Sequence, residues 1–174
     1  MKTDLLIVGA GIYGTVVKEI ADGMGCFERI AFVDDRATET PSGGRVLGTT
    51  ADLGRLAREF GSIAVAIGNP DVKLSLIRRI EAEIPCELVT LVSPRAYVSP
   101  SAQLGKGTVV EPMATVHAGC VLGKGCIVSA GAVINHFAVC GDGVHVDCNA
   151  TVPGNVTVPP AEKIQCGTVF KPLQ

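Results

Sequence analysis

The second half of the chain repeats with a period of six residues, without a break from residue 98 to residue 169. Every sixth position is aliphatic or, once, cysteine: Val98, Leu104, Val110, Val116, Leu122, Val128, Ile134, Cys140, Val146, Val152, Val158 and Ile164. A helix requires a period of 3.6 residues and an ordinary strand a period of two, so neither explains this pattern. A fixed hexapeptide period is typical of a parallel β-helix, in which each repeat forms one flat side of a coil.

A second series of mostly small side chains follows the first at a distance of four residues. It comprises Ala102, Thr108, Ala114, Cys120, Cys126, Ala132, Ala138, Val144, Ala150, Val156, Glu162 and Thr168. Three hexapeptide sides close a triangular coil, and the two series fill its narrow interior. We therefore predict a left-handed parallel β-helix over residues 93–174. The charge of Glu162 in an otherwise small series predicts an irregular last coil.

The composition narrows the function class. Aromatic residues make up only 4% of the chain, which suits a thin prism. A net charge of −2 gives no basic footprint for nucleic acid, and the apolar stretches are too short for membrane insertion. Asp4 and the glycines after it interrupt the apolar start, which argues against a signal peptide. Seven cysteines without a C-x-x-C pair indicate buried thiols in a reducing cytoplasm rather than disulfides or zinc.

The first ninety residues lack the six-residue period and alternate apolar runs with amphipathic stretches. The apolar runs predict strands at 5–8, 29–34, 62–68 and 87–92, and the amphipathic stretches predict helices at 15–24, 50–60 and 71–84. Alternating strands and helices are typical of a doubly wound parallel sheet. We expect a Rossmann-like α/β domain over residues 1–92, joined to the β-helix by a hinge at Ser93-Pro94.

A glycine-rich motif, Gly9-Ala10-Gly11-Ile12-Tyr13-Gly14, lies between the first predicted strand and the first predicted helix. Bare backbone there lets a phosphate approach the helix N-terminus. Asp34 and Asp35 follow the second strand, where an acidic residue normally contacts a ribose or base. The alternative is that these glycines only permit a tight turn, but their place between a strand and a helix favours nucleotide binding. A nicotinamide dehydrogenase would need a second nucleotide-binding half, which the chain lacks, so one nucleotide fits better than a dinucleotide.

Three histidines, His117, His136 and His145, are the side chains that titrate near neutral pH without help. His136 occupies the third place of its hexapeptide and His145 the sixth, both away from the interior. A metal site needs three converging ligands. The spacings of these histidines do not stack their rings in one column, so we expect no metal.

Motifs from both halves together carry a resemblance that covers nearly the whole chain. They are the glycine motif, Phe32-Val33-Asp34-Asp35, Val46-Leu47-Gly48, Ala66-Ile67-Gly68-Asn69 and the hexapeptides around Asn135-His136. With these motifs the chain resembles the bacterial sugar O- and N-acetyltransferases of the sialic acid O-acetyltransferase type. In pattern it is most similar to the members that acetylate nucleotide-linked amino sugars for surface glycans.

The resemblance implies a division of labour between the two halves. The β-helix would assemble as a homotrimer and bind acetyl-CoA in the groove between subunits. His136 matches the family's general base, Gly154 matches the glycine whose N–H faces the developing oxyanion, and His145 matches a second histidine on the acetyl-CoA side. The N-terminal domain would hold the nucleotide sugar through Gly9, Gly11, Ile12, Tyr13, Gly14, Asp34, Asp35, Gly68 and Asn69.

Two departures from the family pattern leave a second hypothesis open. Family members follow the base with Glu or Asp, which holds the imidazole in one tautomer, whereas Phe137 follows His136 here. Asp142 and Asp147 are the nearby candidates to replace that carboxylate. Relatives also continue through further coils that wall the coenzyme groove. The alternative to an acetyltransferase is therefore a non-catalytic trimer that binds a nucleotide sugar.

Outward-facing apolar residues also predict self-association. The positions just before the interior series are largely apolar: Val109, Thr115, Val121, Ile127, Val133 and Val139. Such a surface is more easily buried against neighbouring subunits than left in water.

Overall fold

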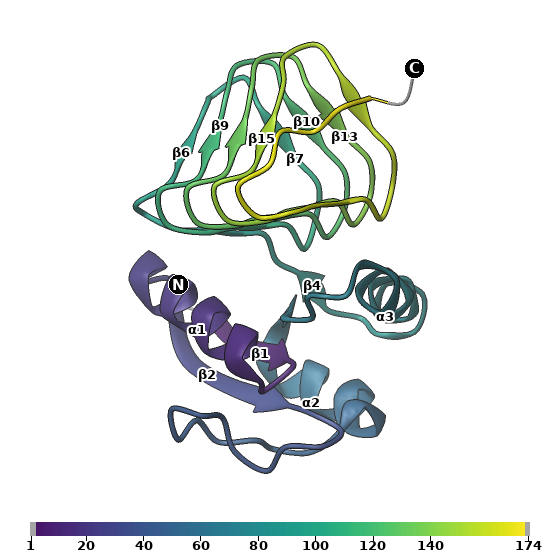
Figure 1. The fold of residues 1–174 in the computed structure, drawn as a ribbon. Helices are drawn as coiled ribbons and strands as arrows, with labels where there is room; N and C mark the ends of the chain where they lie inside the picture. Colours follow the sequence, from purple (N-terminus) through teal and green to yellow (C-terminus); the bar gives the residue numbers. More distant parts are fainter. Residues whose placement is uncertain (1–2, 173–174) are drawn as a thin grey trace. The chain divides into compact units, whose positions relative to one another are not determined.

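The computed structural model describes residues 3–172 of the chain. The chain divides into two compact units between Leu91 and Val92, an α/β unit and a unit of stacked coils (Figure 1).

The first unit is a parallel sheet covered by helices. Its strands are β1 (Thr3–Val8), β2 (Phe27–Val33), β3 (Gly61–Val65) and β4 (Glu87–Leu88), in the order β2-β1-β3-β4. Its helices are α1 (Ile12–Met24), the 3₁₀ turn η1 (Thr50–Asp52), α2 (Leu53–Phe60) and α3 (Pro70–Glu83).

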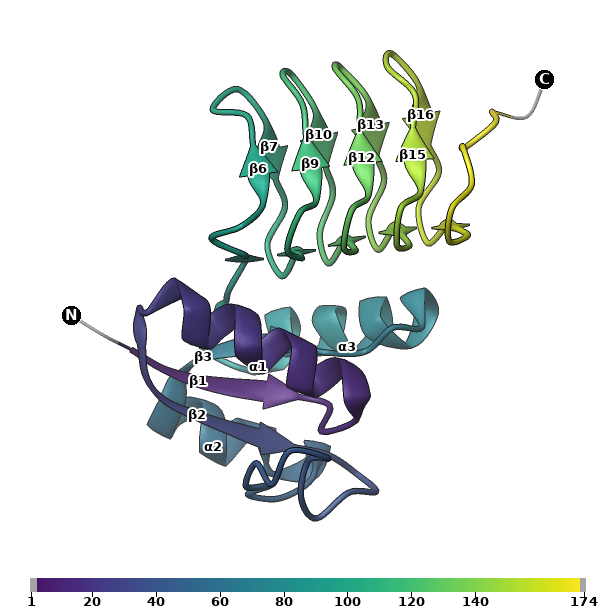
Figure 2. The same cartoon turned by 60° about the vertical axis from the view of Figure 1, so that its left-hand side comes forward.

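Alternate residues of β1 face opposite sides of this sheet, as the period of two requires. Leu6 and Val8 pack with residues of α2 and α3 in one apolar cluster. Leu5 and Ile7 are equally buried and, by the same alternation, face the opposite side of the sheet. Helix α1 runs along that side (Figure 2). Because β2 and β3 flank β1 on opposite sides, the connections reverse direction there. That reversal opens a crevice at the carboxyl ends of the strands, where doubly wound folds bind ligands.

The second unit is a three-sided parallel β-helix with two-residue strands (Figure 2). One side stacks β7 (Gln103–Leu104), β10 (Val121–Leu122), β13 (Val139–Cys140) and β16 (Thr157–Val158). A second stacks β6 (Tyr97–Val98), β9 (Thr115–Val116), β12 (Val133–Ile134) and β15 (Thr151–Val152). The third stacks β5 (Leu91–Val92), β8 (Val109–Val110), β11 (Ile127–Val128), β14 (His145–Val146) and β17 (Lys163–Ile164).

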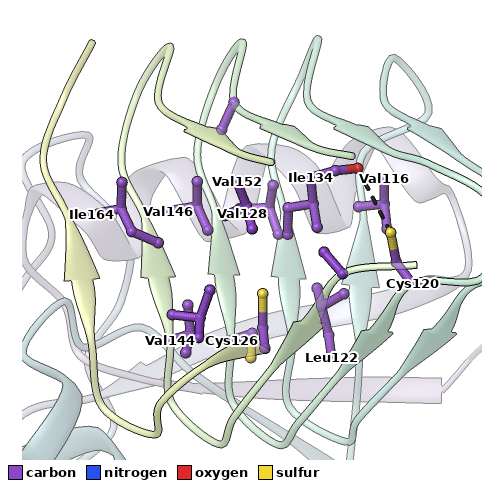
Figure 3. Close-up of a cluster of buried hydrophobic side chains, with 14 of the residues drawn as sticks. Val116, Cys120, Leu122, Cys126, Val128, Ile134, Val144, Val146, Val152 and Ile164 are labelled. Carbon is purple, nitrogen blue, oxygen red and sulfur yellow. Dashed lines mark hydrogen bonds between the residues drawn. The ribbon is translucent and has the colours of Figure 1, made fainter. Parts of the chain in front are cut away.

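Both predicted interior series fill the prism, except that Glu162 and Thr168 at the end of the small series are exposed. Aliphatic residues such as Val116, Ile134 and Val152 are fully buried, and the cysteines of the small series pack among them (Figure 3). Cys120, Cys126 and Cys140 are free thiols in this interior. The predicted fold class is therefore confirmed for both halves of the chain.

Several boundaries differ from the sequence prediction, among them the end of the third strand, which stops at Val65 instead of residue 68. The predicted strand 87–92 is two strands: β4 completes the α/β sheet, whereas β5 pairs with β8 in the β-helix. Helix α1 begins at Ile12, inside the glycine motif, instead of at residue 15. In the last coil, β17 continues its ladder, but the Glu162 side chain is exposed and the next side is reduced to an isolated bridge between Thr151 and Val169, in line with the predicted irregularity.

Candidate active site

His136 lies on the exposed turn between β12 and β13, at a corner of the prism. Gly154 occupies the equivalent turn one coil later, and Asn155 N donates to the His136 carbonyl at 3.0 Å. A Cβ atom on Gly154 would lie 2.8 Å from His136 Nε2, so the imidazole rests directly against the glycine. The structure thus brings together the residues that the resemblance matches to the base and the oxyanion donor.

The side chain of Asn135 holds the other ring nitrogen. Its Oδ1 atom lies 2.8 Å from His136 Nδ1 and also accepts the His136 backbone N–H at 2.9 Å. An amide oxygen only accepts hydrogen bonds, so this contact places the proton on Nδ1 and leaves the Nε2 lone pair free. Nε2, the nitrogen next to Gly154, is therefore the basic one.

Neither carboxylate considered from the sequence orients the His136 ring. Asp142 Oδ1 accepts the backbone N–H of Lys124 at 2.8 Å. Asp147 accepts its neighbour's backbone N–H and forms an ion pair with Lys163 at 3.1 Å. The sequence did not single out Asn135, because the family pattern places the orienting carboxylate after the histidine. The available signal was that a hydrogen-bond acceptor, the Asn135 amide, directly precedes His136.

Phe137 occupies the left-handed region with a φ of 55°. Positive φ is rare for a bulky residue, and strained backbone of this kind is frequent at functional sites. The ring is 60% exposed and stands edge-on to the His136 ring, with centroids 6.2 Å apart. It also covers Gly119, where a side chain would collide with it. Phe137 therefore gives the base an apolar neighbour where the family pattern has an acid.

His145 lies on a different side of the prism, in β14 of the five-stranded sheet. Its ring is 9% exposed, and Nε2 lies 3.2 Å from Ser129 Oγ. Within one chain, therefore, His145 does not share a corner with His136. The third histidine, His117, is exposed on the turn after β9.

The three glycines of the glycine motif in the first unit have different surroundings. Gly9 has a φ of 110° and sits so close to the next loop that a Cβ would lie 2.6 Å from the Ala66 carbonyl oxygen. A side chain on Gly14 would collide with the Gly9 carbonyl, so it permits close packing of helix on strand. Gly11 caps α1, and space is open where its Cβ would be. Gly11 is therefore the glycine of this motif that internal packing does not require.

The first turn of α1 contributes neither a capping side chain nor a charge of its own. Gly11 provides no side-chain cap, and the first turn contains no acidic residue. Ile12 is 80% exposed and Tyr13 is half-buried in that turn. An uncapped helix N-terminus with open space before it suits an anionic group.

The two aspartates after β2 have different surroundings. Asp34 accepts backbone N–H groups from Ala10, Arg36 and Ala37 at 2.8 to 2.9 Å. Burial opposes ionisation, but these donors together lower the pKa of the Asp34 carboxyl below its ordinary value. Asp34 thus ties the glycine motif to the loop after β2. Asp35 accepts the Thr50 N–H at 2.8 Å and also faces a cleft.

That cleft of about 500 Å³ lies at the carboxyl end of the sheet. Its lining comprises Asp35, Thr50, Ile67, Asp71, Val72, Ser75, Leu76 and Arg79. The predicted residues Gly68 and Asn69 adjoin it: Gly68 has open space at its Cβ position, and Asn69 caps α3 by accepting the Val72 N–H. Asp71, Ser75 and Arg79 were missed by the sequence analysis. Their spacing of four residues on one helix face was the available signal.

Two further findings concern metals and membranes. Within residues 3–172, no three His, Cys, Asp or Glu side chains are grouped so that they could hold a metal ion. In the same range, no helix has the length and apolar character needed to cross a bilayer.

Two family models match the chain, one in each unit. The PglD N-terminal domain matches residues 4–80, and the bacterial transferase hexapeptide model of six repeats matches residues 101–136. The first matched range lies within the α/β unit, and the second lies within the β-helix.

Relatives of known structure or assigned activity agree with these models. The acetyltransferase domain of PglB from Neisseria gonorrhoeae FA1090 is 36% identical, with a TM-score of 0.92 over 97% of this chain and 82% of that domain. The same domain has been solved in complex with acetyl coenzyme A. PerB from Caulobacter crescentus, in complex with CoA and GDP-perosamine, is 24% identical with a TM-score of 0.68 and covers 97% and 91% of the two chains. At that identity it supports the fold alone.

A curated relative is the UDP-N-acetylbacillosamine N-acetyltransferase of Bacillus subtilis (strain 168). It is 32% identical over 111 residues, which are 61% of this chain and 50% of that protein. The matched region thus spans half the length of that relative. With the two family models in the expected order and the close match to the PglB domain, the chain belongs to the PglD-like family of hexapeptide-repeat acetyltransferases.

Proposed function

We propose that the chain transfers the acetyl group of acetyl-CoA to the amino group of a nucleotide-linked sugar, with His136 as general base. The observation that carries this proposal is the placement of His136 Nε2, with its free lone pair, against Gly154. The sequence resemblance did not distinguish acetylation of a sugar amine from acetylation of a sugar hydroxyl. The N-acetyltransferase of Bacillus subtilis among its relatives favours the amine.

In the proposed reaction, His136 Nε2 accepts a proton from the sugar amine as the nitrogen forms its bond to the thioester carbon. A general base of this kind contributes about 10²–10⁴-fold to the rate. The Gly154 N–H would donate to the carbonyl oxygen as it gains negative charge, a contribution of about 3 kcal/mol for one donor. Cleavage of the carbon–sulfur bond then releases the CoA thiolate, which recovers the proton from His136.

The nucleotide part of the substrate would occupy the carboxyl edge of the α/β sheet. The uncapped N-terminus of α1 at Gly11 suits the diphosphate. The adjoining cleft, of about 500 Å³, has the size of a small-molecule site and presents the Asp35 carboxylate. We extend the proposal to a cytoplasmic homotrimer that binds acetyl-CoA between neighbouring β-helices, with His145 on the coenzyme side, as the family resemblance implies.

A thiol-release assay with acetyl-CoA and a panel of UDP- and GDP-linked amino sugars tests the activity. We expect turnover with an amino sugar and a loss of about 10²–10⁴-fold in His136→Ala. His117→Ala is the matched control, because His117 is also exposed on a β-helix turn but lacks a glycine partner like Gly154. Equal turnover in the parent and His136→Ala would remove the proposed base.

The second candidate is a non-catalytic trimer that binds a nucleotide sugar. Phe137, which stands where family members have an acid, is the observation that favours it. Calorimetry with acetyl-CoA separates the two candidates, because the acetyltransferase requires saturable binding of acetyl-CoA. A chain that binds a nucleotide sugar but not acetyl-CoA would favour the second candidate.

A further inference from the structure

We propose that Asn135 is the positioning residue of the base, and that its amide replaces the carboxylate that follows the base in the enzymes the chain resembles. This inference rests on the proposed role of His136. Asn135 contacts the imidazole on the side away from Gly154, so it acts through the ring and not on the substrate.

The orientation of the Asn135 amide is fixed by a group that can only donate. The His136 backbone N–H points at the amide at 2.9 Å, so the atom that receives it is the oxygen. The same oxygen lies 2.8 Å from Nδ1. Because both contacts converge on one acceptor, the chain itself specifies the Nδ1–H tautomer, without a charged partner.

The backbone of Asn135 is held as firmly as its side chain. Its N–H donates to the Val152 carbonyl at 3.0 Å in the next coil. Its carbonyl accepts the Ala138 N–H at 3.2 Å and the Cys120 thiol at 3.0 Å from within the prism. The amide therefore extends from a rigid rung, which is the condition for a preorganised site.

Phe137 explains why the orienting group lies before the histidine. Its backbone is in the left-handed region, and its ring covers Gly119 at the edge of the imidazole. A side chain in that position offers no hydrogen-bond acceptor. The adjacent amide on the other side supplies the acceptor that the ring requires.

The tautomer can be measured on the chain alone, without substrate. In chain labelled with ¹⁵N-histidine, the His136 ring resonances, assigned by their loss in His136→Ala, should report a single neutral tautomer with the proton on Nδ1. Asn135→Leu, which has a similar volume but no acceptor, should give mixed tautomers, whereas Asn135→Asp should retain the Nδ1–H form. Unchanged His117 and His145 resonances would establish that the variants fold. A parent-like tautomer in folded Asn135→Leu would overturn the proposal.

Kinetics then tests whether the tautomer matters for turnover. Asn135→Leu should lower kcat by about 10²-fold, since misplacement of a catalytic group by about 1 Å has that effect. KM for both substrates should stay unchanged, because the amide touches only the ring. Asn135→Asp should recover most of kcat. Parent-like kcat in Asn135→Leu would contradict the proposal, whereas a parent chain without turnover would contradict the acetyltransferase function and leave the tautomer measurement to decide the role of Asn135.

Discussion

Gly154 is a glycine because of space and not because of its backbone conformation. Its φ lies outside the left-handed region, so alanine could adopt the same backbone. A Cβ would lie 2.8 Å from His136 Nε2 and 2.9 Å from Cε1, and 3.1 Å from the His136 carbonyl oxygen. Contacts below 3 Å force a shift, and the imidazole is the part that can move.

We therefore expect Gly154→Ala to displace the base while leaving the fold intact. The proposed acetyl transfer should fall by about 10²-fold, with little change in thermal stability. Gly54→Ala is the control, because Gly54 lies in α2 with open space at its Cβ position. Thiol-release kinetics and thermal unfolding of both variants check the expectation. Parent-like turnover in Gly154→Ala would show that the ring position does not limit the rate.

The residues of this corner differ in how well the sequence predicts them. The eighteen-residue coil stacks position 154 on position 136, so their contact follows from the hexapeptide period once the fold is known. The bond between Asn135 and the His136 ring depends on side-chain rotamers, which the period does not determine. His145, which the resemblance matches to the acetyl-CoA side, lies on another side of the prism within one chain, because the nine residues from His136 to His145 carry the chain past a corner.

At the scale of elements, α1 offers a test in which stability and binding change in opposite directions. Gly11 has extended backbone angles at the N-cap and no atoms near its Cβ position, so aspartate fits there. An N-cap aspartate is among the best caps, but replacing glycine there gains only a few tenths of a kcal/mol. Its charge would repel the diphosphate proposed to bind at that N-terminus.

Gly11→Asp should therefore raise the unfolding temperature slightly while weakening the binding of a UDP-linked sugar. Gly11→Asn is the matched neutral variant, which caps the helix equally well without the charge. Thermal unfolding and titration calorimetry measure the two effects. If Asp and Asn weaken binding equally, the effect is steric; if neither weakens it, the substrate does not use this helix end.

The loop after β2 gives the α/β unit a predictable response to acid. Since the pKa of Asp34 is lowered in the folded chain, its ionised form stabilises the fold above the unfolded value, which is about 3.9 for aspartate. This stabilisation is lost as the pH falls through that value toward the folded pKa. Urea unfolding at pH 7 and at a pH near 3 should show a smaller pH effect in Asp34→Asn than in the parent. Identical pH effects in the two proteins would mean that the hydrogen bonds from the three backbone N–H groups stabilise the fold equally well without the negative charge of Asp34.

The order of elements follows from the sequence, but their boundaries follow only in part. The run 87–92 is rich in aliphatic residues and contains no glycine or proline to interrupt it, so it predicts a single strand. In the structure Leu88 pairs within the α/β sheet and Leu91–Val92 begins the coils, because two different sheets share one short run. An apolar residue is buried in either sheet, so its hydrophobicity does not tell which sheet its strand joins. The division between β4 and β5 therefore follows only from the tertiary fold.

At the scale of the whole molecule, the hexapeptide period predicts which residues face outward but not which outer faces are covered. Val109 and Ile127 belong to the predicted outward series, yet each is only 1% exposed in the single chain. Val121 and Val139, which stack on each other in β10 and β13, are 38% and 40% exposed. The apolar surface left for a partner is therefore narrower than the sequence indicated, and it lies beside the exposed ring of Phe137.

We expect light scattering at micromolar concentration to give about three times the 17.9 kDa mass of the chain. The double variant Val121→Glu, Val139→Glu should dissociate, because two adjacent carboxylates would have to be buried in the interface. Val72→Glu, at an exposed valine of α3, is the control and should remain a trimer. A monomeric parent would contradict the proposed assembly. A trimeric double variant would place the subunit contact on another side of the prism.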